Sequence, residues 1–322
     1  MIISASRRTD IPAFFSDWFF NRLSDGYVVV RNPFNANQLS KLKLDGESVD
    51  AIVFWTKNAQ PMLDRLHMID ELGIPYYFQF TITPYGKDAE PGLPSGKTPL
   101  IDTFKALSQM LGPNRVIWRY DPIFLDEDRY TLDFHKRAFE RCAGLLAGST
   151  GRAVISFLDM DYNNTKSINS MGIRDGSDEE KNALAAFMAQ IAEGCGMSLE
   201  TCAEGIDLEA LGIRHGCCVD ADLIEKISGR IIIPKWRKKD SSQRPLCGCM
   251  SSYDIGAYNT CLHGCSYCYA YYAKNAIRTN FEKHDPSSPV LLGECNADAI
   301  PFRKSQASVF SVDEPPAQER LF

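Results

Sequence analysis

Short apolar runs alternate along this chain with longer segments in which apolar residues recur at helical spacing. The first run, residues 2–6, has the length and composition of a buried strand, and a polar turn follows it. Asp10 in that turn can cap a helix that Pro12 opens, and the helical spacing continues until Gly26. Later strand-like runs cover residues 27–30, 51–55, 76–80, 115–118, 153–157 and 199–202, and helical segments cover 62–72, 100–111, 134–146 and 179–191.

This alternation predicts the fold class and its division along the chain. Strands that alternate with helices indicate an α/β fold with a parallel sheet and crossover helices, and about seven such units favour a parallel (β/α) barrel or near-barrel of TIM type. We expect the barrel domain to cover residues 1–230. A cysteine-rich segment, 231–283, is expected to pack on the barrel mouth. Residues 284–322 are rich in Pro, Ser and acidic residues, which predicts an irregular or partly disordered tail.

Polar residues gather where the predicted strands end. In a β/α barrel the loops after the strands converge on one mouth, so these residues form the candidate site, although each alone could be a solvated loop residue or a helix cap. We predict catalytic roles for Arg8, Asp10, Lys57, Arg119 and Asp121, beside Arg7, with Thr56, Asn58, Asp159, Asp161, Asn163 and Glu204 at other strand ends. Cations outnumber anions in the first group, which favours an anionic ligand, because Arg grips a carboxylate or phosphate through two hydrogen bonds.

Composition limits which class of protein this chain belongs to and which cellular compartment we expect for it. The chain has 322 residues, 44% of them hydrophobic, enough for one large α/β domain or two modest ones. It contains no run of about 18 apolar residues and no signal-peptide pattern at its start, so we expect a cytoplasmic protein without a membrane segment. The net charge of −6 opposes broad nucleic-acid binding. The basic segment 230–244 can be a solvated face or a local phosphate-binding strip.

Eleven cysteines, an odd number, indicate metal binding in a reducing compartment rather than disulfides. Cys261, Cys265 and Cys268 have the spacing C-x3-C-x2-C, with Tyr267 before the last of them. Thiolates this close can surround one metal centre. Three protein ligands, unlike the four of a structural zinc, leave one position open for chemistry.

Residues 259–270, NTCLHGCSYCYA, resemble the cluster loop of the radical S-adenosylmethionine (SAM) enzymes, and HGCSYCYA is similar to the version in spore photoproduct lyase and its relatives. The resemblance implies a [4Fe-4S] cluster whose open iron binds SAM, and reductive cleavage of SAM to methionine and a 5′-deoxyadenosyl radical. It also implies an external electron donor of the flavodoxin or ferredoxin type. We expect Tyr267, Arg7 and Arg119 to contact the cofactor. The substrate can be a small molecule, a peptide or a nucleic acid.

The wider chain is similar to a bacterial family catalogued as domain of unknown function 1848. The similarity runs from SASRRTDIP at residues 4–12 through FWTKN at 54–58 to the cysteine loop, and it implies no substrate. In radical SAM enzymes the cluster loop usually follows the first strand. Here it follows roughly 260 residues, with a short strand expected at 253–258 before it and helical character at 269–281 after it. The chain is then either a circularly permuted radical SAM barrel or a complete barrel with a cluster-bearing appendage.

A second set of cysteines precedes that loop. Cys202, Cys218, Cys247 and Cys249 could hold a second [4Fe-4S] cluster or a zinc ion, or be small buried hydrophobic residues. Between the adjacent Cys217 and Cys218 we favour Cys218, because backbone N–H groups at the following helix start can hydrogen-bond a cluster sulfur. The competing hypothesis comes from another functional class. In it, the chain is a zinc- or cluster-stabilised protein that binds a ligand or nucleic acid without radical chemistry.

Overall fold

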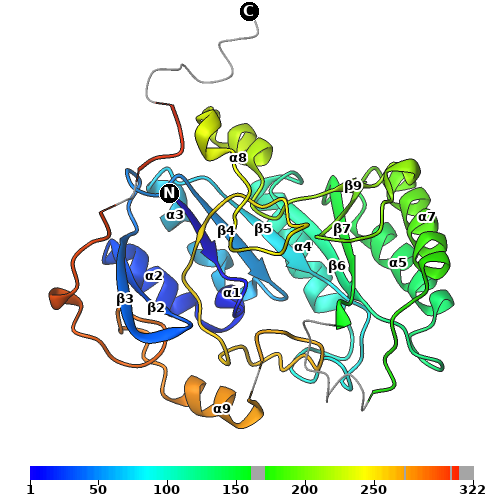
Figure 1. The fold of residues 1–322 in the computed structure, drawn as a ribbon, viewed down its shortest axis with the longest axis horizontal. Helices are drawn as coiled ribbons and strands as arrows, with labels where there is room; N and C mark the ends of the chain where they lie inside the picture. The colour runs from blue at the N-terminus through cyan, green and yellow to red at the C-terminus, as the bar shows by residue number, and fades with distance from the viewer. Residues whose placement is uncertain (161–170, 272, 305–306, 312–322) are drawn as a thin grey trace, which may run out of the picture.

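The computed structural model describes residues 1–160, 171–271, 273–304 and 307–311 (Figure 1). Asp161 and Asn163 lie outside the described residues. The fold is built on one sheet of eight strands in the order β10-β1-β4-β5-β6-β7-β8-β9, and all neighbouring strands are parallel. Their bounds are β1 Ile2–Ala5, β4 Ala51–Thr56, β5 Tyr76–Thr81, β6 Val116–Ile123, β7 Arg152–Phe157, β8 Ser198–Thr201, β9 Arg214–His215 and β10 Tyr253–Asp254. The predicted α/β class with a large parallel sheet is confirmed.

Helices follow most of the strands, as the sequence predicts. Asp10 caps α1 by accepting a hydrogen bond from the Ala13 N–H, and Phe15 then separates α1 from α2, so that the predicted first helix is two. The α-helices are α1 Ile11–Phe14, α2 Ser16–Ser24, α3 His67–Glu71, α4 Thr98–Leu111, α5 Leu132–Leu146, α7 Asp178–Gly194, α8 Ala221–Ser228 and α9 Lys274–Glu282. The 3-10 helices are η1 Gln60–Arg65, η3 Glu209–Leu211, η4 Pro234–Trp236 and η5 Ala297–Ala299.

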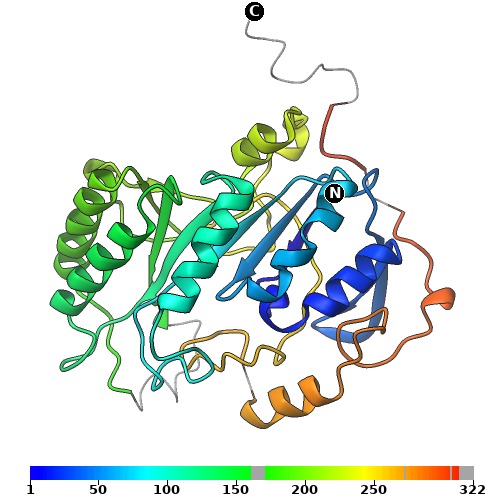
Figure 2. The same cartoon turned by 180° about the vertical axis from the view of Figure 1, so that it is seen from behind.

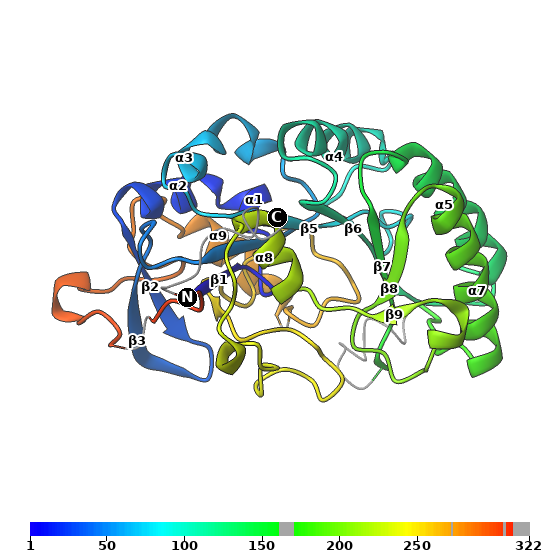
Figure 3. The same cartoon turned by 90° about the horizontal axis from the view of Figure 1, so that it is seen from above.

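Both faces of the sheet are buried, which is why its strands are almost continuously apolar. Residues such as Ile3, Phe54 and Trp118 face the larger core, which the long helices cover. Alternate residues, such as Val53 and Ile117, face a second core with α8. Figure 3 shows α3, α4, α5 and α7 in an arc outside the curved sheet, and α8 on its inner side; Figure 2 shows the outer helices from behind. The curved sheet therefore has a helix-covered outer face and a partly filled inner one.

The sheet is not a closed barrel in the described part of the chain. β9 and β10 are its two ends, and each pairs with one neighbour only. The inner face is filled by α8 and by Cys218, Ile232, Cys249 and Met250, rather than by a closing strand. The closed form of the predicted TIM barrel is therefore not confirmed. The predicted strand at residues 27–30 also differs from expectation: β2 (Tyr27–Asn32) leaves the main sheet and forms an antiparallel hairpin with β3 (Asn35–Lys43).

The strand expected before the cysteine loop is present at one edge of the sheet. β10 pairs in parallel with β1, with Tyr253 opposite Ile3 and Asp254 opposite Ser4. The cysteine loop follows β10, and α9 follows the loop. The segment predicted as separate from the barrel, 231–283, thus contributes a strand to the same sheet. The order of strand, cysteine loop and helix agrees with the sequence prediction.

The described tail residues run along the outside of the hairpin and back to the inner core. Val290 bridges to Val29, Phe302 to Lys41 and Phe310 to Ile232. Besides η5, the described residues of 284–311 contain no helix or strand, so the tail wraps irregularly there, as predicted. Among the described residues, no helix combines the length and the apolar character that crossing a membrane requires.

Candidate functional site

The cysteine loop, residues 259–270, packs over the carboxyl ends of the strands. It contacts the loop that follows β5: the Ser266 N–H donates to the Ala89 carbonyl (2.9 Å), and the Gly92 N–H donates to the His263 carbonyl (2.9 Å). Gly92 must be glycine for this approach, because a Cβ there would lie 2.4 Å from the Leu262 carbonyl oxygen. The cysteine loop therefore packs directly on the loop that follows β5.

The three cysteines of this loop lie close enough to influence one another; Cys265 is buried, Cys261 and Cys268 are half-buried, and one cation lies near two of them. Burial raises the pKa of the Cys265 thiol to about 12, and the Lys57 ammonium opposes that rise. Burial also raises the pKa of Cys268, again opposed by Lys57. The pKa of Cys261 is raised by burial and by the negative charges that Asp10, Cys265 and Cys268 carry when ionised. Three thiols that influence one another, with a cation nearby, suit the anionic ligand set of a metal cluster.

Asp10 fastens the cysteine loop to the end of β1. Its carboxylate accepts hydrogen bonds from His263 Nε2 (2.8 Å), Thr56 Oγ1 (2.7 Å) and the Lys57 N–H (2.7 Å), besides capping α1. His263 also packs edge-on against the Phe14 ring, and its buried Nδ1 has no partner among the described residues. We predicted no role for His263 from the sequence. In the structure its contact with Asp10 joins the cysteine loop to the turn after β1.

Lys57 lies at the centre of a second polar network. Its Nζ is 2.8 Å from Glu90 Oε1 and 3.2 Å from Thr83 Oγ1, and Lys97 Nζ is 2.7 Å from Glu90 Oε2. The Tyr267 hydroxyl donates to the same carboxylate. Burial alone raises the pKa of Glu90, but Lys57 and Lys97 outweigh it and bring the pKa down to about 2. Glu90 therefore remains an anion that orients both Lys57 and Tyr267.

Arg119 and Asp121 lie in β6 itself, because this strand runs to Ile123, beyond the end predicted at residue 118. Arg119 Nε is 3.1 Å from Asp121 Oδ1, and its second nitrogen donates to Gln79 Oε1 (3.1 Å) and to Cys218 Sγ (2.9 Å). The predicted Arg119 and Asp121 thus pair with each other, and they lie beside the second set of cysteines rather than beside Asp10.

The side chains of Arg7 and Arg8 lie in different surroundings. The Arg7 guanidinium stacks on the Trp55 ring (4.5 Å), and one of its nitrogens is buried with no partner among the described residues. Burial lowers the pKa of Arg7, but Cys249 and Cys218 outweigh this and raise it. Arg8 lies over the Tyr258 ring (5.4 Å) and lines a mainly apolar cavity of about 180 Å³. The predicted site residues therefore occupy three neighbouring places rather than one pocket.

The second set of cysteines meets on the inner face of the sheet. Cys202 Sγ is 3.7 Å from Cys218 Sγ, Cys249 Sγ accepts the Cys218 backbone N–H (3.1 Å), and Cys247 packs in the same buried cluster. The structure brings together the four thiols that the sequence groups, while Cys217 takes no part in these contacts. No group of three or more His, Cys, Asp or Glu side chains in the described part of the chain is placed to hold a metal ion as it stands. Metal binding by either cysteine set therefore requires side-chain rotation.

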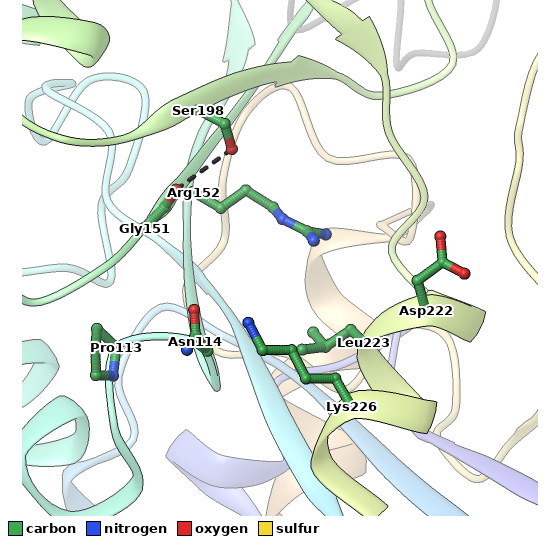
Figure 4. Close-up of a pocket in the computed structure, with 8 residues that line it drawn as sticks. All are labelled: Pro113, Asn114, Gly151, Arg152, Ser198, Asp222, Leu223 and Lys226. Carbon is green, nitrogen blue, oxygen red and sulfur yellow. Dashed lines mark hydrogen bonds between the residues drawn. The ribbon is translucent and has the colours of Figure 1, made fainter. Parts of the chain in front are cut away.

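A further cavity, of about 260 Å³, opens at the other end of the strands (Figure 4). Its lining includes Arg152, which pairs with Asp220 (2.7 Å), and Lys226 of α8. In Figure 4, Ser198 hydrogen-bonds the Gly151 carbonyl at the wall formed by the starts of β7 and β8. Because the cavity lies at the amino ends of these strands, it is separate from both cysteine sets and from the edge where parallel α/β folds carry their chemistry.

Several residues that build the site lack a sequence signal strong enough to find them. Glu90 and Gly92 lie in a long loop after β5, where only the Glu-Pro-Gly sequence marks a tight turn. Asp254 follows no recognisable motif, yet its carboxylate accepts hydrogen bonds from Ser4 (2.9 Å), Ser6 (2.6 Å) and the Arg7 N–H (2.8 Å). These contacts join segments about 250 positions apart, which local patterns do not reveal.

The basic segment 230–244 is partly neutralised in the fold. Arg237 pairs with Asp222 and with Glu225 (2.8 Å), and Arg230 stacks on Phe310 (4.2 Å). These pairs favour the solvated-face interpretation over a phosphate-binding strip.

Comparison with known proteins gives one match. The model of a family described as "Domain of unknown function (DUF1848)" matches residues 2–270. No curated protein and no solved structure matches the chain.

Proposed function

Because the chain belongs to this DUF1848 family, whose description assigns no activity, we propose a function from the site: a radical SAM enzyme that acts on an unidentified substrate. Cys261, Cys265 and Cys268 would hold a [4Fe-4S] cluster. When bound, such a cluster supplies the electron that cleaves SAM and starts radical chemistry. The observation that carries the proposal is the proximity of these three thiols over the strand ends, with Cys265 buried, Cys261 and Cys268 half-buried, and Lys57 near Cys265 and Cys268.

The order of strands in space supports the resemblance on which the proposal rests. The cysteine loop of radical SAM enzymes usually follows the first strand of the sheet. Here it comes late in the sequence but follows β10, the first strand in the spatial order, and β1 is the next strand. A circular permutation produces this arrangement, because it changes where the chain starts without changing which strands are neighbours. A separate appendage on a complete barrel would not place β10 in the sheet.

The surrounding residues have roles that the chain itself provides. Asp10 and His263 hold the cysteine loop in place, and Glu90 keeps Lys57 and Tyr267 oriented. Lys57 favours the thiolate forms of Cys265 and Cys268, because a nearby cation stabilises their negative charge. The unpartnered nitrogen of Arg7 is available to a carboxylate or a similar anion.

One experiment tests the proposal directly. Protein purified anaerobically and reconstituted with iron and sulfide should be brown, with about four irons per chain in this loop and absorbance near about 400 nm that dithionite bleaches. With SAM and dithionite it should release methionine and 5′-deoxyadenosine, measured by mass spectrometry. Cys265→Ala should lose the iron of this loop and the cleavage, whereas Cys142→Ala, which removes a buried thiol of α5, should keep both.

The competing class, a metal-stabilised binding protein without radical chemistry, gives the opposite result. It predicts a colourless protein that binds zinc and leaves SAM intact. Full iron content in the Cys265→Ala protein would equally contradict the assignment of the three-cysteine loop.

A further inference from the structure

We propose that Cys202, Cys218, Cys247 and Cys249 form a closed, tetrahedral site for one zinc-type divalent ion, separate from the three-cysteine loop. The four residues come from the end of β8, the turn before α8 and the segment that leads into β10. The inference does not depend on the proposed radical chemistry, because it concerns other ligands and another metal.

The distance between two of the sulfurs favours a single ion over a four-iron cube. A tetrahedron with metal–sulfur bonds of about 2.3 Å has sulfur–sulfur edges of about 3.8 Å. Cys202 Sγ and Cys218 Sγ are 3.7 Å apart. In a cube each cysteine binds a different iron, which holds the cysteine sulfurs well beyond contact. The pair is already at the separation that one shared ion requires.

The other two sulfurs are joined to this pair through Cys249. Its sulfur accepts backbone N–H groups from Cys218 (3.1 Å) and Val219 (3.4 Å), and Cys247 packs in the same buried cluster as Cys218 and Cys249. N–H groups aimed at a sulfur are the usual outer shell of a metal thiolate. Cys217 is left out of the ligand set, since its sulfur makes no hydrogen bond to the other thiols among the contacts of the described residues. Because each thiol turns about its Cα–Cβ bond, rotation of the side chains would close the four sulfurs round an ion, which they do not surround as they stand.

The cations around the four thiols offset negative charge of the filled site. Four thiolates and one divalent ion carry a net charge of −2. Arg119 donates to Cys218 Sγ at 2.9 Å, and the Arg7 guanidinium, one of whose buried nitrogens lacks a partner, is attracted to Cys249 and Cys218. The two guanidinium groups therefore offset part of the charge of the site, although Asp121 also pairs with Arg119, and such compensation is needed because burying uncompensated charge is costly.

The position of the site explains what the ion would do for the fold. Residues 231–252 contain only η4 and two isolated bridges, Ile232 to Phe310 and Lys239 to Met250. So long a connection without regular structure has few contacts to order it. An ion bound to Cys247 and Cys249 would fix its end to β8 and α8, immediately before β10 and the cysteine loop. Structural zinc contributes binding energy of this kind to folding.

The test uses the full chain with Cys261, Cys265 and Cys268 replaced by Ala, so that iron in the three-cysteine loop cannot contribute. Elemental analysis should find about one zinc per chain, and X-ray absorption should find four sulfur neighbours at about 2.3 Å. Adding Cys249→Ser should reduce the zinc to below about 0.1 per chain. Adding Cys217→Ser, the matched control, should leave the zinc in place. The absorption measurement needs no substitution at the site, so poor folding of the serine variant does not prevent a decision.

Three results would overturn the inference. The first is about four irons per chain in the triple variant, which would indicate a second cube. The second is a Cys202–Cys218 disulfide in protein purified without oxidant. The third is metal-free protein whose melting temperature does not rise when zinc chloride is added. None of these results bears on SAM cleavage by the parent protein, so failure here and failure of the proposed function remain distinguishable.

Discussion

His263 Nε2 lies 2.8 Å from Asp10 Oδ2, and this contact joins residues 253 positions apart in the sequence. Both side chains are buried, one from the cysteine loop and the other from the turn after β1. Asp10 also binds Thr56 and the Lys57 backbone, so one carboxylate ties together the ends of β1 and β4 and the cysteine loop. The position of the three thiols thus depends on a residue at the opposite end of the sequence.

Replacing that carboxylate should weaken both the fold and the cysteine loop. Asp10→Asn keeps the shape but loses the charge that strengthens several hydrogen bonds, and we expect it to lower the free energy of unfolding by about 1.5 to 3 kcal/mol. Urea denaturation measures this. The control is Asp17→Asn, because Asp17 pairs with Arg65 at 2.7 Å but is 73% exposed. Its cost should stay below about 1 kcal/mol. Equal costs at the two positions would show that Asp10 anchors nothing.

The contact between Gly92 and the cysteine loop gives a second prediction. In Gly92→Ala the new methyl group would meet the backbone of Leu262 and His263, so the loop must shift. We expect a loss of about 1 to 3 kcal/mol of stability and reduced iron content after reconstitution. Gly96→Ala, in the same loop, is the matched control, because a Cβ at Gly96 meets no atom within 4 Å. If the two variants bind iron equally, the docking of these loops has no bearing on the site.

Local sequence patterns predict which segments form helices and strands better than they predict which strands pair with one another. The apolar run at 51–55 is β4, and the helical spacing at 100–111 and 134–146 is α4 and α5, because burial on both sides of a sheet leaves a clear apolar signature. β9 is only two residues long, too short for periodicity to reveal, whereas the equally short β10 lies within the strand expected at 253–258. The run at 27–30 has strand composition, but composition does not tell that it pairs in a separate hairpin.

For the candidate site too, local patterns identify residues but not the partners of those residues. The start of the following helix favours Cys218 over Cys217, and Cys218 Sγ lies 3.7 Å from Cys202 Sγ; the helix signal also places Asp10 correctly as the cap of α1. What the sequence does not give is the partner of each charge. Arg119 is engaged by Asp121, Gln79 and Cys218, and Lys57 by Glu90; these pairs form across the sheet and across loops. Such contacts depend on the tertiary arrangement, which no local pattern encodes.

Arg119 and Arg8, both candidates from the sequence, should respond differently to substitution. Arg119 is buried and paired with Asp121, so Arg119→Ala leaves a charge without its partner and should cost about 3 to 5 kcal/mol of stability. Arg8 contacts only the Tyr258 ring and a cavity through its side chain, among the contacts of the described residues. Arg8→Ala should keep the fold and the iron but weaken SAM binding about ten- to a hundredfold, as measured by equilibrium dialysis. Unchanged SAM affinity would remove Arg8 from the site.

His135 should make the stability of the protein depend on pH. Its ring is buried between the Tyr120 hydroxyl and the Phe124 carbonyl, each 2.9 Å away, and both contacts suit the neutral imidazole. Burial lowers the pKa of His135 to about 4, although the Phe124 carbonyl and Asp126 act against the shift. Below the ordinary pKa of about 6.5, the unfolded chain takes up a proton that the folded protein refuses until about pH 4. Stability contributed by the neutral ring is therefore present above about pH 6.5 and lost as the pH falls to about 4.

The expected loss over this interval is about 3 kcal/mol, found by comparing urea denaturation of the parent and of His135→Gln at several pH values. The variant, which has no imidazole at this position, should lose correspondingly less stability on acidification, whatever its stability at neutral pH. His67→Gln is the control, because His67 is exposed, and its curve should follow that of the parent. If the curves of the parent and His135→Gln run parallel between pH 6.5 and pH 4, the buried imidazole takes up its proton as readily in the folded protein as in the unfolded chain.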